Sequence, residues 1–385
     1  GLVSSGMNVA LLGPMPTPAI AYLTRTLNAS AGIVISASHN SYEDNGVKFF
    51  SELGKKLDSS LEGLISQKLD RDYPMLVSNG IGKVTRINDA SGRYVEFCKS
   101  CFPTELNLRG VKIALDCANG AAYQVAPKVF SELGAELKSI GVSPDGYNIN
   151  AAVGSTKPNA LVALVKECGA DFGIALDGDG DRLIMVDRTG EIIDGDELLY
   201  FIALSKLRAG TLRGGVVGTQ MSNLGLEEAL ANLGVPFYRA LVGDRYVLEE
   251  LTKREWLLGG EASGHIHCLE QTSTGDAIVA ALQVLSACSN LGQSLEELRK
   301  NIIKYPQHIV NVPTKEPVKK DILARLSTFV AHAEQALGRK GRVVLRASGT
   351  EPVVRVMVEG ENAPTVVRLA ETLANEAEKE FSKMV

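Results

Sequence analysis

The fold of this chain is decided by the stretch Phe172-Gly-Ile-Ala-Leu-Asp-Gly-Asp-Gly-Asp-Arg182, an apolar strand that runs directly into an acidic loop. Three further stretches repeat this design of an apolar strand followed by a small polar loop: Gly32–Asn40, Trp256–His265 and Arg342–Glu351. Ligands of open α/β folds bind outside the carboxyl ends of the strands. The four loops therefore predict an α/β protein that binds its ligand at several strand ends.

Between these loops the hydrophobic pattern predicts repeated strand–helix alternation. Strands are expected at 111–116, 136–140, 172–176, 216–217 and 237–240, and helices at 122–133, 159–168, 195–207, 223–233 and 246–252. The last part of the chain differs, with strands expected at 310–313, 343–346 and 353–358 and helices at 318–337 and 364–381. We expect four domains, the last a smaller α+β unit, over residues 1–90, 91–190, 191–303 and 304–385.

Composition excludes several classes of function. The net charge of −5 and the absence of blocks of like charge give no sign of a nucleic-acid partner or an anionic membrane surface. No run of 18 apolar residues is present, and no secretory signal is visible at the start. Of the six cysteines only Cys98 and Cys101 are closely spaced, which favours reduced thiols over a zinc site and predicts a cytoplasmic location.

The acidic loop predicts a site for a hard cation. Asp177, Asp179 and Asp181 alternate with glycines, and three carboxylates this close repel one another unless a cation lies among them. All-oxygen ligation suits Mg²⁺ or Ca²⁺. An EF-hand is excluded because Arg182 and Arg188 stand where that loop needs glycine and glutamate. The alternative is a solvated acidic turn, but Arg182 beside the carboxylates favours a phosphate ligand.

Two other loops offer a nucleophile and a sugar-binding surface. Ser38 has a hydroxyl at a strand end, where it is either a nucleophile prepared by a base or a metal, or a helix-capping serine. Glu261, Ser263 and His265 alternate after a strand and can face one ligand together. A structural histidine is the alternative for His265, and the nearby His267 weakens the signal.

The fourth loop predicts a phosphate cradle. Ser348, Gly349 and Thr350 offer hydroxyls and successive N–H groups. Arg346 and Arg355 flank them and can bind phosphate oxygens in a bidentate manner. The alternative is a β-turn with two surface arginines. Neither a Walker A pattern nor a dinucleotide-binding glycine motif is found.

Taken together, the loops resemble one family, the α-D-phosphohexomutases. The resemblance rests on the four loops in the family's order, and further on four stretches: Gly13-Pro-Met-Pro-Thr-Pro18, Asn148-Ile-Asn-Ala-Ala-Val-Gly-Ser-Thr156, Val242-Gly-Asp-Arg-Tyr-Val247 and Thr274-Gly-Asp276. It covers essentially the whole chain and is closest to the bacterial phosphoglucosamine mutases. It implies a heart-shaped enzyme with three related mixed-sheet α/β domains and a smaller phosphate-binding α+β domain. In chain order, the first three would carry the phosphoserine, the metal and the sugar.

The resemblance also implies a mechanism and residue roles. Glucosamine 6-phosphate and glucosamine 1-phosphate would interconvert through phosphorylated Ser38 and a bisphosphate intermediate. One Mg²⁺ would be held by Ser38 and the three aspartates, with Lys48 and His265 as candidates for proton transfer. The implied substrate-binding residues are His39, Arg182, Arg245, Glu261, Ser263, Arg346, Ser348, Gly349, Thr350 and Arg355.

Two departures from the family pattern are visible. Ser41 replaces the usual proline after Ser-His-Asn. The family's opening segment, a strand with a glycine-rich loop bearing an arginine, has no counterpart here, so we expect an incomplete sheet in the first domain.

Rival interpretations are a phosphoglucomutase or phosphomannomutase, a metal-dependent sugar-phosphate phosphatase, and a non-catalytic sugar-phosphate binding protein. The expected partner is a small hexosamine phosphate, with no nucleic acid or membrane, and the sequence leaves a homodimer open.

Overall fold

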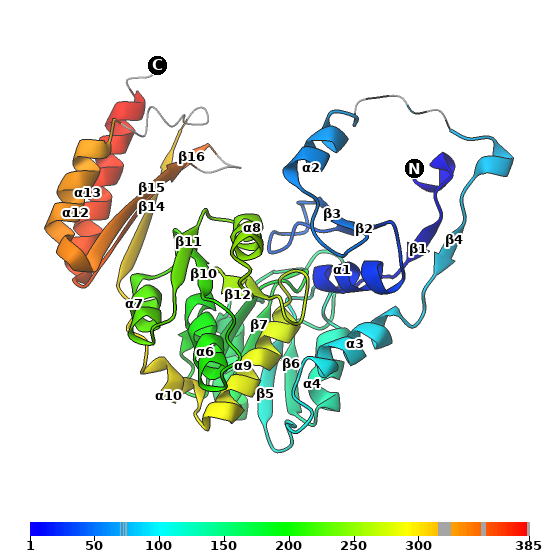
Figure 1. Ribbon diagram of the computed structural model, residues 1–385, viewed down its shortest axis with the longest axis horizontal. Coiled ribbons are helices and arrows are strands. Elements are labelled where there is room, and N and C mark those ends of the chain that lie inside the picture. The colour runs from blue at the N-terminus through cyan, green and yellow to red at the C-terminus, as the bar shows by residue number, and fades with distance from the viewer. Residues whose placement is uncertain (70, 72, 74, 315–324, 348–351, 383–385) are drawn as a thin grey trace.

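The computed structural model describes residues 1–69, 71, 73, 75–314, 325–347 and 352–382. Four α/β units follow one another along the chain (Figure 1). The first and last units lie on opposite sides of a central body formed by the second and third units. In the described part of the chain, no helix combines the length and hydropathy needed to cross a membrane.

The first unit contains two separate pairs of strands rather than one sheet. Strand β1 pairs in parallel with β4, and β2 pairs antiparallel with β3. The sequence led us to expect an incomplete sheet here, and the two pairs are not hydrogen-bonded to each other. The elements are β1 (Val9–Leu11), α1 (Thr17–Thr26), β2 (Ala31–Ile35), β3 (Val47–Ser51), α2 (Ser59–Ser66) and β4 (Val84–Arg86).

The second unit is a five-stranded mixed sheet with the order β6-β5-β7-β8-β9. Its first three strands are parallel, whereas β7–β8 and β8–β9 are antiparallel. The elements are α3 (Ala90–Ser100), β5 (Lys112–Asp116), α4 (Val125–Glu132), β6 (Glu136–Ile140), α5 (Asn159–Cys168), β7 (Phe172–Leu176), β8 (Leu183–Asp187) and β9 (Ile192–Ile193). Helix α4 begins later than the expected residue 122, since the left-handed residues Ala118 and Asn119 place a turn before it.

The third unit repeats this topology. Its sheet has the order β11-β10-β12-β13, with three parallel strands and an antiparallel edge strand. The elements are α6 (Gly195–Arg208), β10 (Val216–Thr219), α7 (Leu224–Asn232), β11 (Phe237–Ala240), α8 (Asp244–Arg254), β12 (Leu258–Gly260), β13 (Ile266–Cys268), α9 (Ala277–Leu291) and α10 (Leu295–Arg299). The shared topology shows that the second and third units are related.

Local sequence sets the start of the two central helices. Asp194 and Glu197 form a reciprocal capping box at the start of α6, and Asp276 accepts hydrogen bonds from two backbone N–H groups at the start of α9. Such caps satisfy backbone donors that a helix start leaves unpaired. Both helices are buried along most of their length in a core shared by the first three units.

The fourth unit has a core of its own. Its antiparallel sheet has the order β14-β16-β15 and is covered by two helices. The elements are β14 (Gln307–Pro313), α12 (Ser327–Leu337), β15 (Gly341–Ala347), β16 (Val353–Gly360) and α13 (Ala363–Ser382). Part of the helix expected at 318–337 lies outside the described residues. Arg342 joins this unit to the third by donating to the carbonyls of Gln220 and Ser222, at 2.7 and 2.5 Å.

Candidate active site

The polar loops share one position in the topology. Each connects a strand to its antiparallel neighbour, and this holds for the pairs β2–β3, β7–β8, β12–β13 and β15–β16. The chain therefore leaves each sheet at a strand's carboxyl end and returns beside it. In the first three units, such a hairpin places the polar loop outside the strands, where a ligand can reach it.

The loop after β2 directs a hydroxyl at the acidic loop. Ser38 Oγ donates a hydrogen bond of 2.7 Å to Asp177 Oδ2, although the two residues are 139 positions apart. Ser38 has a left-handed backbone, with φ of 54°, and its N–H donates to Ser36 Oγ at 2.9 Å. Asn150 Nδ2 donates to the carbonyls of Ser38 and Asn40, at 2.9 and 2.8 Å. The serine is therefore held in place from both sides.

The three aspartates form a buried cluster of oxygen ligands. Asp177, Asp179 and Asp181 are 0, 2 and 4% exposed, and a carboxylate oxygen of each lies within 4.8 Å of the others. Burial, together with the charges of Asp181 and Asp179, raises the pKa of Asp177 well above its usual value. Asp179 Oδ1 is buried and has no hydrogen-bond partner among the described residues. This donor set fits Mg²⁺ or Ca²⁺, which would offset the repulsion and satisfy that oxygen.

Lys48 reaches the same cluster from β3. Its Nζ lies 2.6 Å from Asp179 Oδ2 and 3.5 Å from Asp181 Oδ2. Burial opposes the lysine charge, but the carboxylates of Asp181 and Asp179 outweigh it and raise the Lys48 pKa. Thr17 Oγ1 also donates to Asp179 Oδ2, at 2.5 Å. The first unit thus supplies a hydroxyl, a cation and a second hydroxyl to the aspartates of the second unit.

His265 connects the aspartates to the third unit. Its Nδ1 lies 3.5 Å from Asp181 Oδ1, and its Nε2 lies 3.5 Å from Asp244 Oδ2. Burial by itself would lower the His265 pKa, but these two carboxylates raise it. Glu261 Oε1 accepts a hydrogen bond of 2.9 Å from the Gly243 N–H, and Ser263 is exposed. The loop after β12 is therefore anchored by Glu261 and open to solvent at Ser263.

Two arginines of the fourth unit lie directly opposite each other. Arg346 and Arg355 are partners in the β15–β16 register, and like charges in that position destabilise a sheet unless an anion joins them. Burial and the charge of Arg355 lower the Arg346 pKa, while Glu261 of the third unit opposes that shift. Ser348, Gly349 and Thr350, which were predicted to form the cradle between them, lie outside the described residues.

The remaining predicted residues lie around this centre. His39 is half-buried, and burial and the charge of Arg182 lower its pKa, so these two residues lie near each other. Arg182 forms an isolated antiparallel bridge with His265. Arg245 forms an ion pair with Glu62 of α2. The structure therefore brings His39 and Arg182 to the aspartate cluster and links Arg245 to the first unit.

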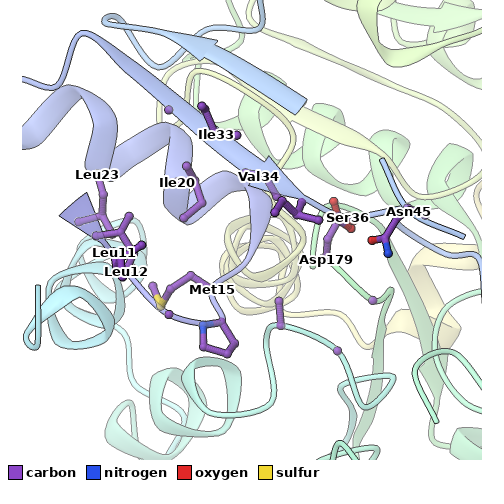
Figure 2. A pocket seen from close by; sticks show the side chains of 18 of the residues that line it. Leu11, Leu12, Met15, Ile20, Leu23, Ile33, Val34, Ser36, Asn45 and Asp179 are labelled. Carbon is purple, nitrogen blue, oxygen red and sulfur yellow. The ribbon is translucent and has the colours of Figure 1, made fainter. Parts of the chain in front are cut away.

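A large cavity reaches the serine loop from the first unit (Figure 2). Its volume is about 1220 Å³. Leu11, Ile20 and Ile33 line its apolar end, and Ser36 and Asp179 line its polar end. Residues of β1, α1 and β2 line it together with the loop that carries Ser38, so the cavity extends from these elements to the candidate site.

Sequence reasoning gave no role to Asn150, Thr17 or Asp244, which the structure places in the site. All three occur in stretches that resemble the family, so the motifs were visible but their functions were not. The function of Asn150 depends on carbonyls more than a hundred positions away, and no local pattern reveals such a contact.

Comparison with known proteins identifies the class. The chain matches all four domains described as phosphoglucomutase/phosphomannomutase: α/β/α domains I, II and III at residues 1–74, 92–190 and 194–305, and the C-terminal domain at 309–376. The chain belongs to this family. The boundaries at 90, 190 and 303 stay predictions.

Curated relatives specify a branch of the family. A phosphoglucosamine mutase of Aeromonas salmonicida is 57% identical over 99% of this chain and 86% of its own length. Another, of Hahella chejuensis, is 56% identical over 97% of this chain and 84% of its own length. The recognition of the family from its four loops is confirmed.

Solved structures show the same fold at low identity. A phosphoglucomutase/phosphomannomutase family protein of Burkholderia thailandensis has a TM-score of 0.79 at 22% identity, covering 98% of this chain and 85% of its own. The N-acetylphosphoglucosamine mutase of Aspergillus fumigatus, in complex with GlcNAc-6P and magnesium, has a TM-score of 0.74 at 18% identity, covering 95% and 92%. The predicted four-unit α/β architecture is confirmed.

Proposed function

We propose that this chain is a phosphoglucosamine mutase, which interconverts glucosamine 6-phosphate and glucosamine 1-phosphate. The activity named for the curated relatives supports this proposal. The observation that carries it is the 2.7 Å hydrogen bond from Ser38 Oγ to Asp177. It places the serine hydroxyl against a buried cluster of carboxylates, as transfer of a phosphoryl group to and from serine requires.

Ser38, Asp177, Asp179 and Asp181 would hold one Mg²⁺. When bound, the ion would neutralise charge on the phosphate oxygens during transfer. The phosphoryl group of phosphorylated Ser38 passes to the free hydroxyl of the substrate: the serine P–O bond breaks and a P–O bond to the sugar forms. The sugar hydroxyl gives up its proton to a neighbouring base, and Ser38 Oγ takes up a proton as it leaves, so the step balances. The resulting bisphosphate turns, and its other phosphate returns to Ser38.

Residues of three units would handle proton transfer, sugar binding and phosphate binding. Lys48 is cationic in its carboxylate environment, so it donates a hydrogen bond to the reacting oxygen, and His265 is the second candidate for proton transfer. Glu261 and Ser263 contact the sugar. Arg346 and Arg355 bind the phosphate that is not reacting, together with Ser348, Gly349 and Thr350. A cradle of this kind accepts either phosphate of the bisphosphate.

The decisive experiment is a coupled assay on glucosamine 6-phosphate with Mg²⁺ and a trace of hexose bisphosphate. We expect glucosamine 1-phosphate to form without release of inorganic phosphate. Release of phosphate would instead indicate a phosphatase, and tight binding without turnover would indicate a binding protein. Faster turnover of glucose or mannose phosphates would move the chain to another branch of the family.

The phosphoserine is tested by intact-mass measurement and peptide mapping of the purified protein. We expect one phosphate on Ser38, and loss of activity by several orders of magnitude in Ser38→Ala. Ser36→Ala is the matched control, because the Ser36 hydroxyl accepts a hydrogen bond from the Ser38 N–H and so supports the serine loop. If Ser36→Ala is inactive and Ser38→Ala is active, the nucleophile is misassigned.

A further inference from the structure

A second cluster of metal-ligating side chains lies beside the three aspartates. Asp244, His265 and His267 each place a ligand atom within 4.8 Å of the others. His265 and His267 alternate at the start of β13, so both rings face the same side, and their centroids lie 5.0 Å apart. Asp244 is the first residue of α8. Two elements of the third unit therefore converge on one point.

The imidazole of His267 is buried without a partner. The residue is 0% exposed, and neither Nδ1 nor Nε2 has a hydrogen bond to any described residue. Such groups are rare in folded proteins, because an unpaired buried polar group loses its hydration without compensation. Burial and the neighbouring His265 lower the His267 pKa to about 3.

His265 offers a second free ligand atom at the same place. Its Nε2 is buried and also lacks a hydrogen-bond partner among the described residues, and it lies 3.5 Å from Asp244 Oδ2. The other ring nitrogen faces Asp181 on the opposite side. Metal-bound histidines commonly direct their second nitrogen at a carboxylate in this way.

We propose that Asp244, His265 and His267 bind one Zn²⁺ ion, at a site separate from the aspartate cluster. Two imidazoles and one carboxylate form the donor set of three-ligand zinc sites, which keep a fourth position open. The aspartate cluster offers only oxygen and suits harder cations. The two sites therefore differ in ligand chemistry as well as in position.

Occupancy of this site has a structural consequence through Lys56. The Lys56 ammonium belongs to the first unit and forms an ion pair with Asp244 Oδ2 of the third unit. A second contact between these units lies nearby in the sequence, where the Gly54 carbonyl accepts a 2.6 Å hydrogen bond from Ser273. A divalent cation and an ammonium group compete for one carboxylate. Zinc binding therefore releases Lys56 from its ion pair with Asp244 in the third unit. It also occupies His265, a candidate for proton transfer, so zinc inhibits the mutase. The inhibition rests on the proposed function.

Zinc titration by calorimetry, with Mg²⁺ in saturating excess, tests the site. We expect one Zn²⁺ per chain in the parent and a loss of affinity of at least about 100-fold in His267→Leu and His267→Gln, since loss of an outer contact alone costs about 10- to 100-fold. His332→Gln, on an exposed histidine, should bind zinc like the parent. Lys56→Met removes the competing cation and should tighten binding.

Cobalt substitution reports the coordination independently of activity. Four-coordinate Co²⁺ with two imidazoles absorbs strongly in the visible range, whereas an all-oxygen octahedral site does not. We expect this absorption in the parent and its absence in both His267 variants, which should keep their zinc-free mutase activity.

Equal zinc binding by the parent and both His267 variants, or no zinc binding by the parent, would overturn the proposal. Both measurements are made without substrate, so they stand even if the mutase assay fails.

Discussion

Replacement of Asp179 by asparagine removes a charge from the aspartate cluster while keeping its shape. The amide retains an oxygen that can accept from Thr17 Oγ1 and Lys48 Nζ, which bind Asp179 Oδ2 at 2.5 and 2.6 Å. The amide nitrogen takes the place of Oδ1, which has no hydrogen-bond partner among the described residues. The variant therefore separates the role of the charge from that of the loop conformation.

The electrostatic effects on the metal-free fold nearly cancel. The carboxylate oxygens lie within 4.8 Å of one another, so at an effective dielectric constant of about 20 each repulsion is at least about 3.5 kcal/mol. Two repulsions disappear in Asp179→Asn. The attraction to Lys48 at 2.6 Å, about 6 kcal/mol on the same scale, disappears as well. The free energy of unfolding in EDTA should therefore stay close to that of the parent.

Chemical unfolding with and without Mg²⁺, together with the mutase assay, measures the result. At a Mg²⁺ concentration 100 times Kd, the parent should gain about 2.7 kcal/mol of stability. Asp179→Asn should gain far less and lose mutase activity. Asp89→Asn is the control, because that carboxylate is exposed and forms its ion pair with the exposed Arg93, an interaction that solvent screens.

Full activity of Asp179→Asn, or a gain in stability from Mg²⁺ equal to that of the parent, would rule out a metal-binding role for Asp179. A large loss of stability in EDTA would show that the charge of Asp179 maintains the fold itself, contrary to the estimated balance.

Three further predictions concern contacts that surround the site. Asn150→Ala removes two hydrogen bonds to the serine loop, worth together about 2 kcal/mol, and should lower kcat with little change in KM. Glu261→Gln keeps the acceptor for the Gly243 N–H but loses the negative charge. The ratio kcat/KM should therefore fall by about 10- to 100-fold, the scale of a lost polar partner. Kinetics like those of the parent would remove Glu261 from the site. Burial raises the Asp276 pKa from 3.8 to about 6. The folded state therefore binds the proton of the Asp276 carboxyl group more tightly than the unfolded state does. About 3 kcal/mol of stability that is present at low pH is lost as the pH rises through 6. Asp276→Asn should flatten this decline in urea unfolding measured between about pH 4 and 7, and an unchanged slope would contradict the assignment.

Local sequence was sufficient for many of the elements. The strand at 136–140, the helix at 159–168 and the strand at 172–176 have the bounds that their hydrophobic pattern predicted. Periodicity gave no expectation for α9, because that helix is buried along most of its length and has no polar face to mark its period. The strand-to-loop junctions were equally local, since each is an apolar run that ends at small polar residues.

The sequence by itself identified the candidate site side chains: the hydroxyl of Ser38, the three carboxylates and the two arginines of the last unit. Only the tertiary structure decided their partners. Lys48 lies on Asp179 across 131 positions, Asn150 holds the Ser38 carbonyl, and Arg346 lies opposite Arg355. His267 drew little notice in the sequence, and packing buried it beside His265 and Asp244. The physical reason is that residue type and spacing fix local conformation, whereas contacts between distant segments depend on the register and packing of whole elements.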